Sequence, residues 1–313
     1  NDFPPIRWRS LDLQIEELKM AKNIIENLSA IEFLDDTFLA MPYSRIKDFA
    51  NKYKEQLDLK FGILSSPINV SYEKLRVLAE AGLNFVGIGI QSAYEPVRQL
   101  YRRRENLEQI KNDSEIIDRV SKEIKRRITV KYDFIVDNPW GGQRDVEESI
   151  RFALSLKKPF HLAIFSLVFY PGTELYEKAK SEGLINDDLN QIYRVTHLTL
   201  KFTYMNEVFL LMGQGAPNWL IRQLLNKKIR SLRFARFLRK FFYVFVRYPQ
   251  VIKVFLFERF RQNKKLVLFQ ALHKIRNRFR SKKLTLRVPQ FKGAPGEFQG
   301  DFSYENTLCY SRK

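Results

Sequence analysis

Polar side chains follow several short apolar runs in the first 180 residues, at the point where each run ends. An acidic pair follows the run at 31–34, an amide and a hydroxyl follow the run at 84–90, and an Asp-Asn pair follows the run at 129–136. Carboxylate, amide and hydroxyl oxygens accept hydrogen bonds from ammonium groups and from sugar hydroxyls. The candidate binding residues are Asp35, Asp36, Gln91, Ser92, Asp137, Asn138 and, after the run at 162–168, Tyr170.

Each of these positions also has an ordinary structural interpretation, and spacing alone leaves both open. Asp36 can cap a short turn, and Asp137 with Asn138 stands before a proline in a pattern that forms turns. Gly87 and Gly89 leave room beside their strand either for a ligand or for a tightly packed neighbour.

Two further features carry the same ambiguity. The arginine run at 102–104 can clamp a carboxylate or a phosphate, although a run of charges is more often solvated. Tyr170 precedes Pro-Gly-Thr, so it either closes a tight turn before the next helix or offers a ring on which a ligand stacks.

Several classes of site are excluded or disfavoured. The histidines, His161, His197 and His273, are far apart and lack the spacing of metal ligands. The single cysteine, Cys309, rules out an internal disulfide and a cysteine-clustered zinc or iron–sulfur site. The sequence has no P-loop, and no GxGxxG follows a predicted strand. We therefore expect no metal ligands in this chain.

The candidate residues must be positioned by alternating strands and helices along residues 1–200. Strands are expected at 31–34, 60–64, 84–90, 129–136 and 162–168, and helices at 10–28, 42–57, 71–81, 95–100, 107–126, 145–157 and 174–182. This alternation predicts an α/β fold with a parallel sheet. The runs FVGIGI and AIFSLVF predict strands buried on both faces. A closed or partial barrel and an open sheet both fit, and each places its site at the C-terminal strand ends.

The net positive charge of the 313-residue chain comes entirely from its C-terminal third. Residues 201–313 hold 25 Lys and Arg against 5 Asp and Glu, whereas residues 1–200 hold 29 against 30. With 45% apolar residues overall, the chain can form a sizeable core. We predict a barrel domain over 1–200 and a basic helical extension with an irregular tail over 201–313.

The basic extension predicts two long helices, Trp219–Arg247 and Val251–Phe279, with phenylalanines among the basic residues. Helices rich in apolar and basic residues suit a membrane surface, where long basic side chains reach the lipid headgroups. Packing against the barrel fits equally well, and nucleic acid is the less favoured partner. The expected partners are an unknown substrate and a membrane or lipid surface contacted peripherally through residues 219–280.

Five segments taken together resemble the radical S-adenosylmethionine (SAM) superfamily, and most of all its members that carry a cobalamin-binding domain. They are IEFLDDTF, GLNFVGIGIQS, LYRRREN, KYDFIVDNPWG and SLVFYPGTELYEKA, within residues 8–185. Each motif alone is weak, and their order and spacing carry the resemblance. It implies a partial (β/α) barrel of six strands, five of which are present, followed here by the basic α-helical extension.

The same resemblance exposes a gap. The family's CxxxCxxC loop, which holds a 4Fe–4S cluster, is absent, so the chain looks like one that begins just downstream of that loop. Three thiolates are needed for the cluster, and this chain cannot supply them. The cluster ligands and any cobalamin domain are therefore expected outside this chain, and we expect this fragment alone to be inactive.

Carried over by position, the resemblance implies roles for the candidate residues around SAM. Asp35 and Asp36 match the segment that meets the methionine amino group, and Gln91 with Ser92 matches a strand end near the ribose and the carboxylate. One arginine of the 102–104 run, with Arg103 as the candidate, is expected to pair with that carboxylate. Asp137 and Asn138 stand where the family often has Gly-Leu, near the nucleoside.

The functional prediction is a fragment of a radical SAM enzyme, cobalamin-dependent in type. The full-length enzyme would generate a 5′-deoxyadenosyl radical or transfer a methyl group to an unactivated carbon. The alternative is a non-catalytic, cluster-less barrel remnant whose basic aromatic helices bind a membrane or an anionic partner. The single cysteine fits a cytoplasmic protein with peripheral membrane contact.

Overall fold

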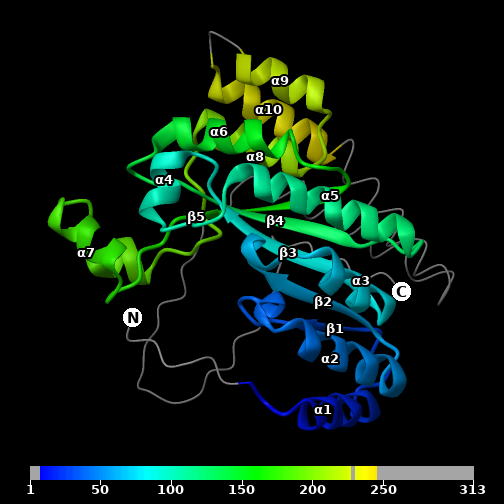
Figure 1. Ribbon diagram of the computed structural model, residues 1–313. Coiled ribbons are helices and arrows are strands. Elements are labelled where there is room, and N and C mark those ends of the chain that lie inside the picture. The colour runs from blue at the N-terminus through cyan, green and yellow to red at the C-terminus, as the bar shows by residue number, and fades with distance from the viewer. Residues whose placement is uncertain (1–7, 227–229, 245–313) are drawn as a thin grey trace, which may run out of the picture. The chain divides into compact units, whose positions relative to one another are not determined.

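The computed structural model describes residues 8–226 and 230–244. Its centre is one sheet of five parallel strands in the order β1-β2-β3-β4-β5 (Figure 1). The strands are β1 (Ala30–Phe33), β2 (Lys60–Ser65), β3 (Leu83–Gln91), β4 (Thr129–Val136) and β5 (Phe160–Ser166). Because each strand pairs with the next along the chain, the order is that of a (β/α) barrel and not of a doubly wound sheet. The predicted α/β fold with five barrel strands is confirmed.

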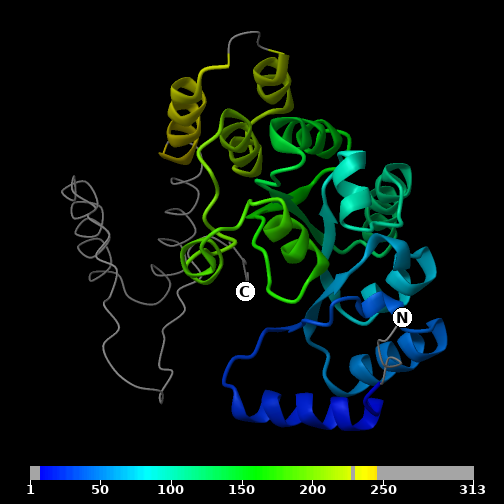
Figure 2. The same cartoon turned by 90° about the vertical axis from the view of Figure 1, so that its left-hand side faces the viewer.

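Helices join the strands at the predicted places, with ends that differ by a few residues. They are α1 (Leu11–Ile24), α2 (Tyr43–Gln56), α3 (Tyr72–Glu80), α4 (Glu95–Leu100), α5 (Leu107–Glu123), α6 (Gly142–Ala153) and α7 (Glu174–Ser181). The short helices η1 (Phe38–Ala40) and η2 (Pro67–Asn69) lie in loops after β1 and β2. Helix α3 packs between α2 and α5, and Figure 2 shows these three in one layer on the same face of the sheet.

The two faces of the sheet differ, most clearly in β4. Of the two runs predicted to be buried on both faces, FVGIGI is buried or half-buried at every residue, whereas AIFSLVF is mostly half-buried. In β4, the side chains of Val130, Tyr132, Phe134 and Val136 are buried beneath the helices. The alternate residues, Lys131, Asp133 and Ile135, are only half-buried on the opposite, inner face. The inner face of a barrel is covered only in part when some of its strands are missing from the sheet. Polar groups are therefore tolerated there.

Aromatic packing anchors the β1–β2 edge of the sheet. Phe33 of β1 meets Phe38, Phe49 and Phe61 with ring centroids 5.3, 5.4 and 5.8 Å apart, and Tyr53 packs on Phe61 at 4.7 Å. Most of these pairs are tilted or edge-to-face, the geometries that the ring quadrupole favours. The acidic residues that follow β1 are thus attached to a tightly packed part of the sheet.

A helix that the sequence reasoning missed covers the other edge. Helix α8 (Tyr204–Gly213) begins at Thr203, whose side chain accepts a hydrogen bond from the Asn206 amide, and it packs on β5 and α6. Helix α9 (Asn218–Asn226) follows and buries Ile221, Leu224 and Leu225. The tyrosine hydroxyl of Tyr204 donates to the Leu224 carbonyl at 2.9 Å.

The predicted single helix over Trp219–Arg247 is wrong, because α9 ends at Asn226 and α10 (Leu232–Phe242) begins anew. Ser231 caps the new helix, accepting from the Phe234 amide through its hydroxyl and from the Ala235 amide through its carbonyl. The second predicted helix, Val251–Phe279, and the tail lie outside the described residues.

Contacts divide the described residues into two compact units. The first contains residues 8–226 and 230–235, and the second contains 236–244. The boundary predicted at residue 200 stays a prediction.

Candidate functional site

Two neighbouring cavities lie beyond the C-terminal ends of β3, β4 and β5. Their volumes are about 320 and about 310 Å³, and they share Val168, Tyr170 and His197 in their walls. The first cavity is completed by Gln91, Asp133, Ile135, Phe165, Ser166 and Leu167. Both lie at the edge where parallel strands of a barrel place their ligands.

A charged pair on the inner face of β4 lies beside the first cavity, and the sequence reasoning missed it. Asp133 Oδ1 stands 3.6 Å from Lys131 Nζ and accepts no hydrogen bond. Burial raises the pKa of Asp133, the Lys131 ammonium opposes that shift, and the Glu32 carboxylate of β1 adds to it. The available signal was the alternation of Lys131, Asp133 and Ile135 in β4, which puts two charges on one face of a strand.

Gln91 ends β3 in an unusual backbone conformation that brings its side chain over the sheet. Its φ is +68°, and the register with β4 shifts between Gly89 and Gln91. A Cβ at Gly89 would stand 2.6 Å from Gln91 Nε2, so a larger residue there would displace the end of the Gln91 side chain. At Gly87 the corresponding space is taken by Leu64. In this structure, both glycines make room for neighbouring side chains.

Arg103 is the only member of the 102–104 run directed at the end of β3. Arg102, two positions after the last residue of α4, has a φ of +53°. The amide of Arg102 donates to the Gln99 carbonyl, and that of Arg103 donates to the Arg98 carbonyl. This pair of hydrogen bonds is a Schellman motif. The Arg103 guanidinium donates to the Gly89 carbonyl at 2.6 Å and pairs with Glu105 at 2.5 Å. Its Nε is buried without a hydrogen-bond partner.

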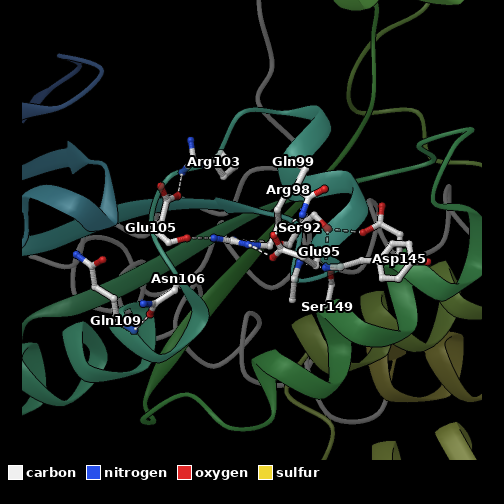
Figure 3. Close-up of polar contacts among 12 residues, drawn as sticks. Ser92, Glu95, Arg98, Gln99, Arg103, Glu105, Asn106, Gln109, Asp145 and Ser149 are labelled. Atoms are coloured by element: carbon white, nitrogen blue, oxygen red, sulfur yellow. Dashed lines mark hydrogen bonds and ion pairs between the residues drawn. The ribbon is translucent and has the colours of Figure 1, made fainter.

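Ser92 lines neither cavity, and its side chain points toward Asp145 in the packing between α4 and α6 (Figure 3). It is fully buried, donates to Asp145 Oδ1 at 2.5 Å, and accepts from the Tyr94 amide at 2.9 Å. Burial raises the pKa of Asp145 to about 6, although the Ser92 hydrogen bond opposes the shift. These contacts give Ser92 a structural role here, and its predicted contact with SAM stays a prediction.

The side chains of Asp137 and Asn138 form hydrogen bonds with other groups of the protein. Asp137 Oδ2 accepts from Ser166 at 2.8 Å and from the Lys201 amide at 2.9 Å, while Oδ1 accepts from Asn206 at 2.7 Å. Asn138 donates to the Tyr101 hydroxyl and accepts from the amides of the following turn. The sequence left open whether these residues bind a ligand or form a turn, and these contacts are those of a turn.

The acidic pair after β1 and the tyrosine after β5 are both exposed. Asp35 and Asp36 lie in the turn that follows β1, two strands away from Gln91, and line neither cavity. Tyr170 is 62% exposed and lines both cavities. The structure therefore brings Gln91 and Tyr170 together around the cavities, with Arg103 tied to the backbone of the same β3 end, and leaves the acidic pair apart.

The second cavity has aromatic and apolar walls. Phe169, Tyr170 and Tyr193 line it together with Pro171, Ile192, Val195 and Thr196. Tyr193 ends a π-helical turn, η3 (Leu189–Tyr193), which buries Ile192 and leaves Tyr193 largely exposed. The His197 carbonyl accepts from the Ser166 amide at 2.7 Å, which ties this wall to the end of β5.

Residues 1–153 match the Radical SAM superfamily. This segment therefore carries the radical SAM sequence that the resemblance predicted, and four of the five motifs lie within it, whereas SLVFYPGTELYEKA follows it.

Two curated relatives align with different shares of the chain. A bacteriochlorophyllide d C-8(2)-methyltransferase from Chlorobaculum tepidum is 24% identical over 202 residues, which cover 60% of this chain and 43% of that protein. The heme chaperone HemW from Bacillus subtilis is 27% identical over 134 residues, which cover 42% of this chain and 34% of that protein. The chain thus spans less than half the length of the curated relatives it matches.

Among solved structures, the radical SAM methyltransferase TsrM from Kitasatospora setae, with cobalamin and a [4Fe–4S] cluster bound, aligns with a TM-score of 0.44. The alignment has 15% sequence identity and covers 56% of this chain and 32% of that one.

The iron–sulfur cluster that the family implies does not fit this chain. A cluster site requires clustered cysteine thiolates, and the only cysteine is Cys309, which lies outside the described residues. Among residues 8–226 and 230–244, no group of three His, Cys, Asp or Glu side chains is placed to hold a metal ion.

No helix in that same part of the chain has both the length and the apolar character needed to cross a membrane.

Proposed function

We propose that the first cavity binds SAM and that the complete protein is a radical SAM enzyme. The observation that carries this proposal is a pair of buried, unsatisfied polar groups at one strand edge. Arg103 Nε makes no hydrogen bond, and Asp133 Oδ1 has only the ion pair with Lys131 at 3.6 Å, although both atoms are buried. Because orphaned buried polar atoms destabilise a fold by a few kcal/mol, they are expected where a ligand completes the site.

Both groups are tied to the same β3–β4 strand pair. The Arg103 guanidinium is bound to the Gly89 carbonyl, and Gly89 is the register partner of Asp133. Gln91 and Asp133 then line the same cavity. A cationic donor beside a carboxylate and an amide matches a ligand that carries a carboxylate together with hydroxyl or ammonium donors.

These residues would divide the recognition of SAM. Arg103 would bind the methionyl carboxylate, and Asp133 with Gln91 would accept hydrogen bonds from the ribose hydroxyls. Lys131, 3.6 Å from Asp133, opposes the rise that burial causes in the pKa of that carboxyl group. In radical SAM enzymes bound SAM supplies the radical or the methyl group. No step through a cluster is assigned to this chain.

The test is calorimetric titration of the 313-residue chain with SAM. Arg103→Met should weaken binding by about 1.5–3 kcal/mol, the contribution of one charge-assisted hydrogen bond. Arg104→Met, at an exposed neighbouring position, is the matched control and should bind like the wild type. Binding that is equal in all three proteins would remove Arg103 from the site.

The second cavity supports a proposal for the substrate class. The two curated relatives are named for a bacteriochlorophyllide and for heme, and both compounds are tetrapyrroles. The second cavity opens beside the first. The aromatic side chains in its walls would stack on part of a flat apolar ring. We propose that the substrate is a ring of this kind, held between Tyr170 and Tyr193.

Zinc protoporphyrin IX is a fluorescent probe for that site. Tyr193→Ala should lower its affinity for the chain, whereas Tyr193→Phe should keep it because the ring is retained. Tyr43→Ala, at an exposed tyrosine on α2, controls for non-specific adsorption. Equal quenching by the wild type and by Tyr193→Ala would exclude the second cavity as the ring site.

The basic extension supports a separate proposal of contact with an anionic membrane surface. Of its described part, α9 buries its apolar face, which leaves α10 with Arg233, Arg236, Arg239 and Lys240 among its phenylalanines. Phe237 is 62% exposed and is the first candidate for insertion. The full chain should co-sediment with anionic vesicles, only partly released by salt, and Phe237→Asp should reduce the salt-resistant part. Binding to RNA with complete loss at high salt would favour nucleic acid instead.

A further inference from the structure

Behind Arg103 lies a buried charged network that the cavity itself does not include (Figure 3). Its centre is Arg98 of α4, whose side chain is 2% exposed. Arg98 donates to the Ser92 carbonyl at 3.2 Å through one nitrogen and to the Glu105 carbonyl through another. One guanidinium thus joins the residue that follows β3 to a residue two positions before α5.

Glu105 contributes its side chain to the same network. Its carboxylate is 4% exposed and pairs with Arg103 at 2.5 Å. Burial lowers the pKa of Arg98, whereas the Glu105 carboxylate raises it and the nearby Arg103 guanidinium lowers it. Glu105 is therefore the buried anion that two guanidinium groups share, one structural and one at the strand end.

An arginine side chain has several rotatable bonds, so its position at a binding site must be fixed by other groups. The Schellman motif fixes only the backbone of Arg103. Its guanidinium is held by two partners, the Gly89 carbonyl and the Glu105 carboxylate. Of these, only Glu105 can be changed by a side-chain substitution.

We propose that Glu105 is a positioning residue, which holds the Arg103 guanidinium at the end of β3 so that it can bind the carboxylate of SAM. The inference rests on the proposed function of Arg103. Glu105 itself is not placed to touch the ligand, because its side chain is 4% exposed and its carboxylate lies against Arg103, whose own side chain is 21% exposed. Its loss should therefore affect only those ligands that Arg103 recognises.

The experiment compares two ligands on the full chain by calorimetry, SAM and 5′-methylthioadenosine, which lacks the amino acid moiety. Glu105→Gln should weaken SAM binding about tenfold, the effect of one misplaced charge-assisted hydrogen bond, and should leave 5′-methylthioadenosine binding unchanged. Glu95→Gln is the matched control. Glu95 also faces Arg98, at 3.6 Å, but its side chain is exposed and belongs to the helix surface.

A double-mutant cycle separates positioning from a general loss of structure. In the Arg103→Met background, Glu105→Gln should have no further effect on SAM affinity. An additional loss there, or an equal loss for both ligands, would show that Glu105 only supports the fold and would overturn the inference. Thermal unfolding of each variant identifies any that is not folded, and Glu105→Asp, which keeps the charge, should then restore part of the SAM affinity if positioning is correct.

The outcomes also separate this inference from the function on which it rests. If Arg103→Met leaves SAM affinity unchanged, the proposed SAM site is wrong and the inference is overturned with it. If Arg103→Met weakens SAM binding and Glu105→Gln does not, the site stands and the positioning role is wrong.

Discussion

The two halves of the sheet are stabilised in different ways. The β1–β2 half rests on interlocking aromatic rings, and its acidic residues, Asp35 and Asp36, are exposed beyond the strand. The β3–β5 half buries charges on its inner face and behind its strand ends, and both cavities open there. Residues of the same type at equivalent strand ends therefore differ in what surrounds them. The difference teaches that a polar residue at a strand end is by itself insufficient to identify a site, and that its surroundings must be known as well.

The largest effect should come from the aromatic half. Phe49 is 1% exposed and packs on Phe33, Phe38 and Phe61 with centroids 5.3–5.8 Å apart. Phe49→Ala should lower the free energy of unfolding by about 3–5 kcal/mol, because it removes a buried ring and leaves a cavity. Urea unfolding followed by circular dichroism measures this. Leu34→Ala, at an exposed position after β1, should change stability by less than about 0.5 kcal/mol.

Much of the fold could be predicted from the sequence, because apolar periodicity reports burial directly. Strand β4 and helix α4 have the expected bounds, and the other four strands differ at their ends by one or two residues. Helix α8 was missed because nearly all of its residues are apolar or buried, so no amphipathic period marks it. The break before α10 depends on Ser231 as a cap, a local signal inside a strong helical pattern.

The candidate site was predicted less well, because its residues depend on contacts between distant segments. Whether Asp137 binds a ligand depends on Lys201 and Asn206, which lie more than sixty residues further along the chain. Asp133 was overlooked because it lies inside a strand and not at its end. Gln91 and Tyr170 were found because strand ends gather at one edge whatever the loops do.

The second prediction tests the charged half through pH. Burial raises the pKa of Asp113 from 3.8 to about 7, and the Glu105 carboxylate adds to the shift. The folded state therefore holds a proton that the unfolded chain releases near pH 4, so this group's stabilising contribution is present in acid and is lost as pH rises to 7. At about 1.4 kcal/mol per pH unit, the loss reaches about 4 kcal/mol.

Asp113→Asn should flatten this dependence and stabilise the protein at pH 8, as measured by urea unfolding at several pH values. Asp145, whose pKa burial raises to about 6, should leave a smaller slope of the same sign. Asp12→Asn, at an exposed position on α1, should follow the wild type. A wild type whose stability rises between pH 5 and 8 would contradict the assignment of a buried, protonated Asp113.

The third prediction asks whether Asp137 is structural. Its carboxylate joins the end of β4 to Ser166, Lys201 and Asn206. Asp137→Asn should destabilise the protein by about 1.5–3 kcal/mol, because one oxygen becomes an amide group that cannot accept from these donors. Asparagine tolerates the φ of +64°, so backbone strain does not add to the effect. Unchanged stability with weaker SAM binding would return Asp137 to the ligand site.

The smallest expected effect is a gain. Arg102 occupies the left-handed position that ends α4, where an L-residue is strained by about 1–2 kcal/mol and glycine is not. Glycine loses about 0.5–1 kcal/mol in backbone entropy on folding. The exposed Arg102–Glu174 pair, which Arg102→Gly removes, contributes at most a few tenths of a kcal/mol. The strain term wins, so Arg102→Gly should stabilise the protein by about 0.5 kcal/mol.

Arg102→Ala separates the two contributions, because it removes the same ion pair but keeps the strained backbone. It should therefore be neutral or slightly destabilising in urea unfolding, while Arg102→Gly gains. Both variants should bind SAM like the wild type, since the Schellman hydrogen bonds that hold the Arg103 backbone come from main-chain groups. A loss of SAM affinity in Arg102→Gly alone would mean that the strained turn, and not Glu105, fixes the Arg103 guanidinium.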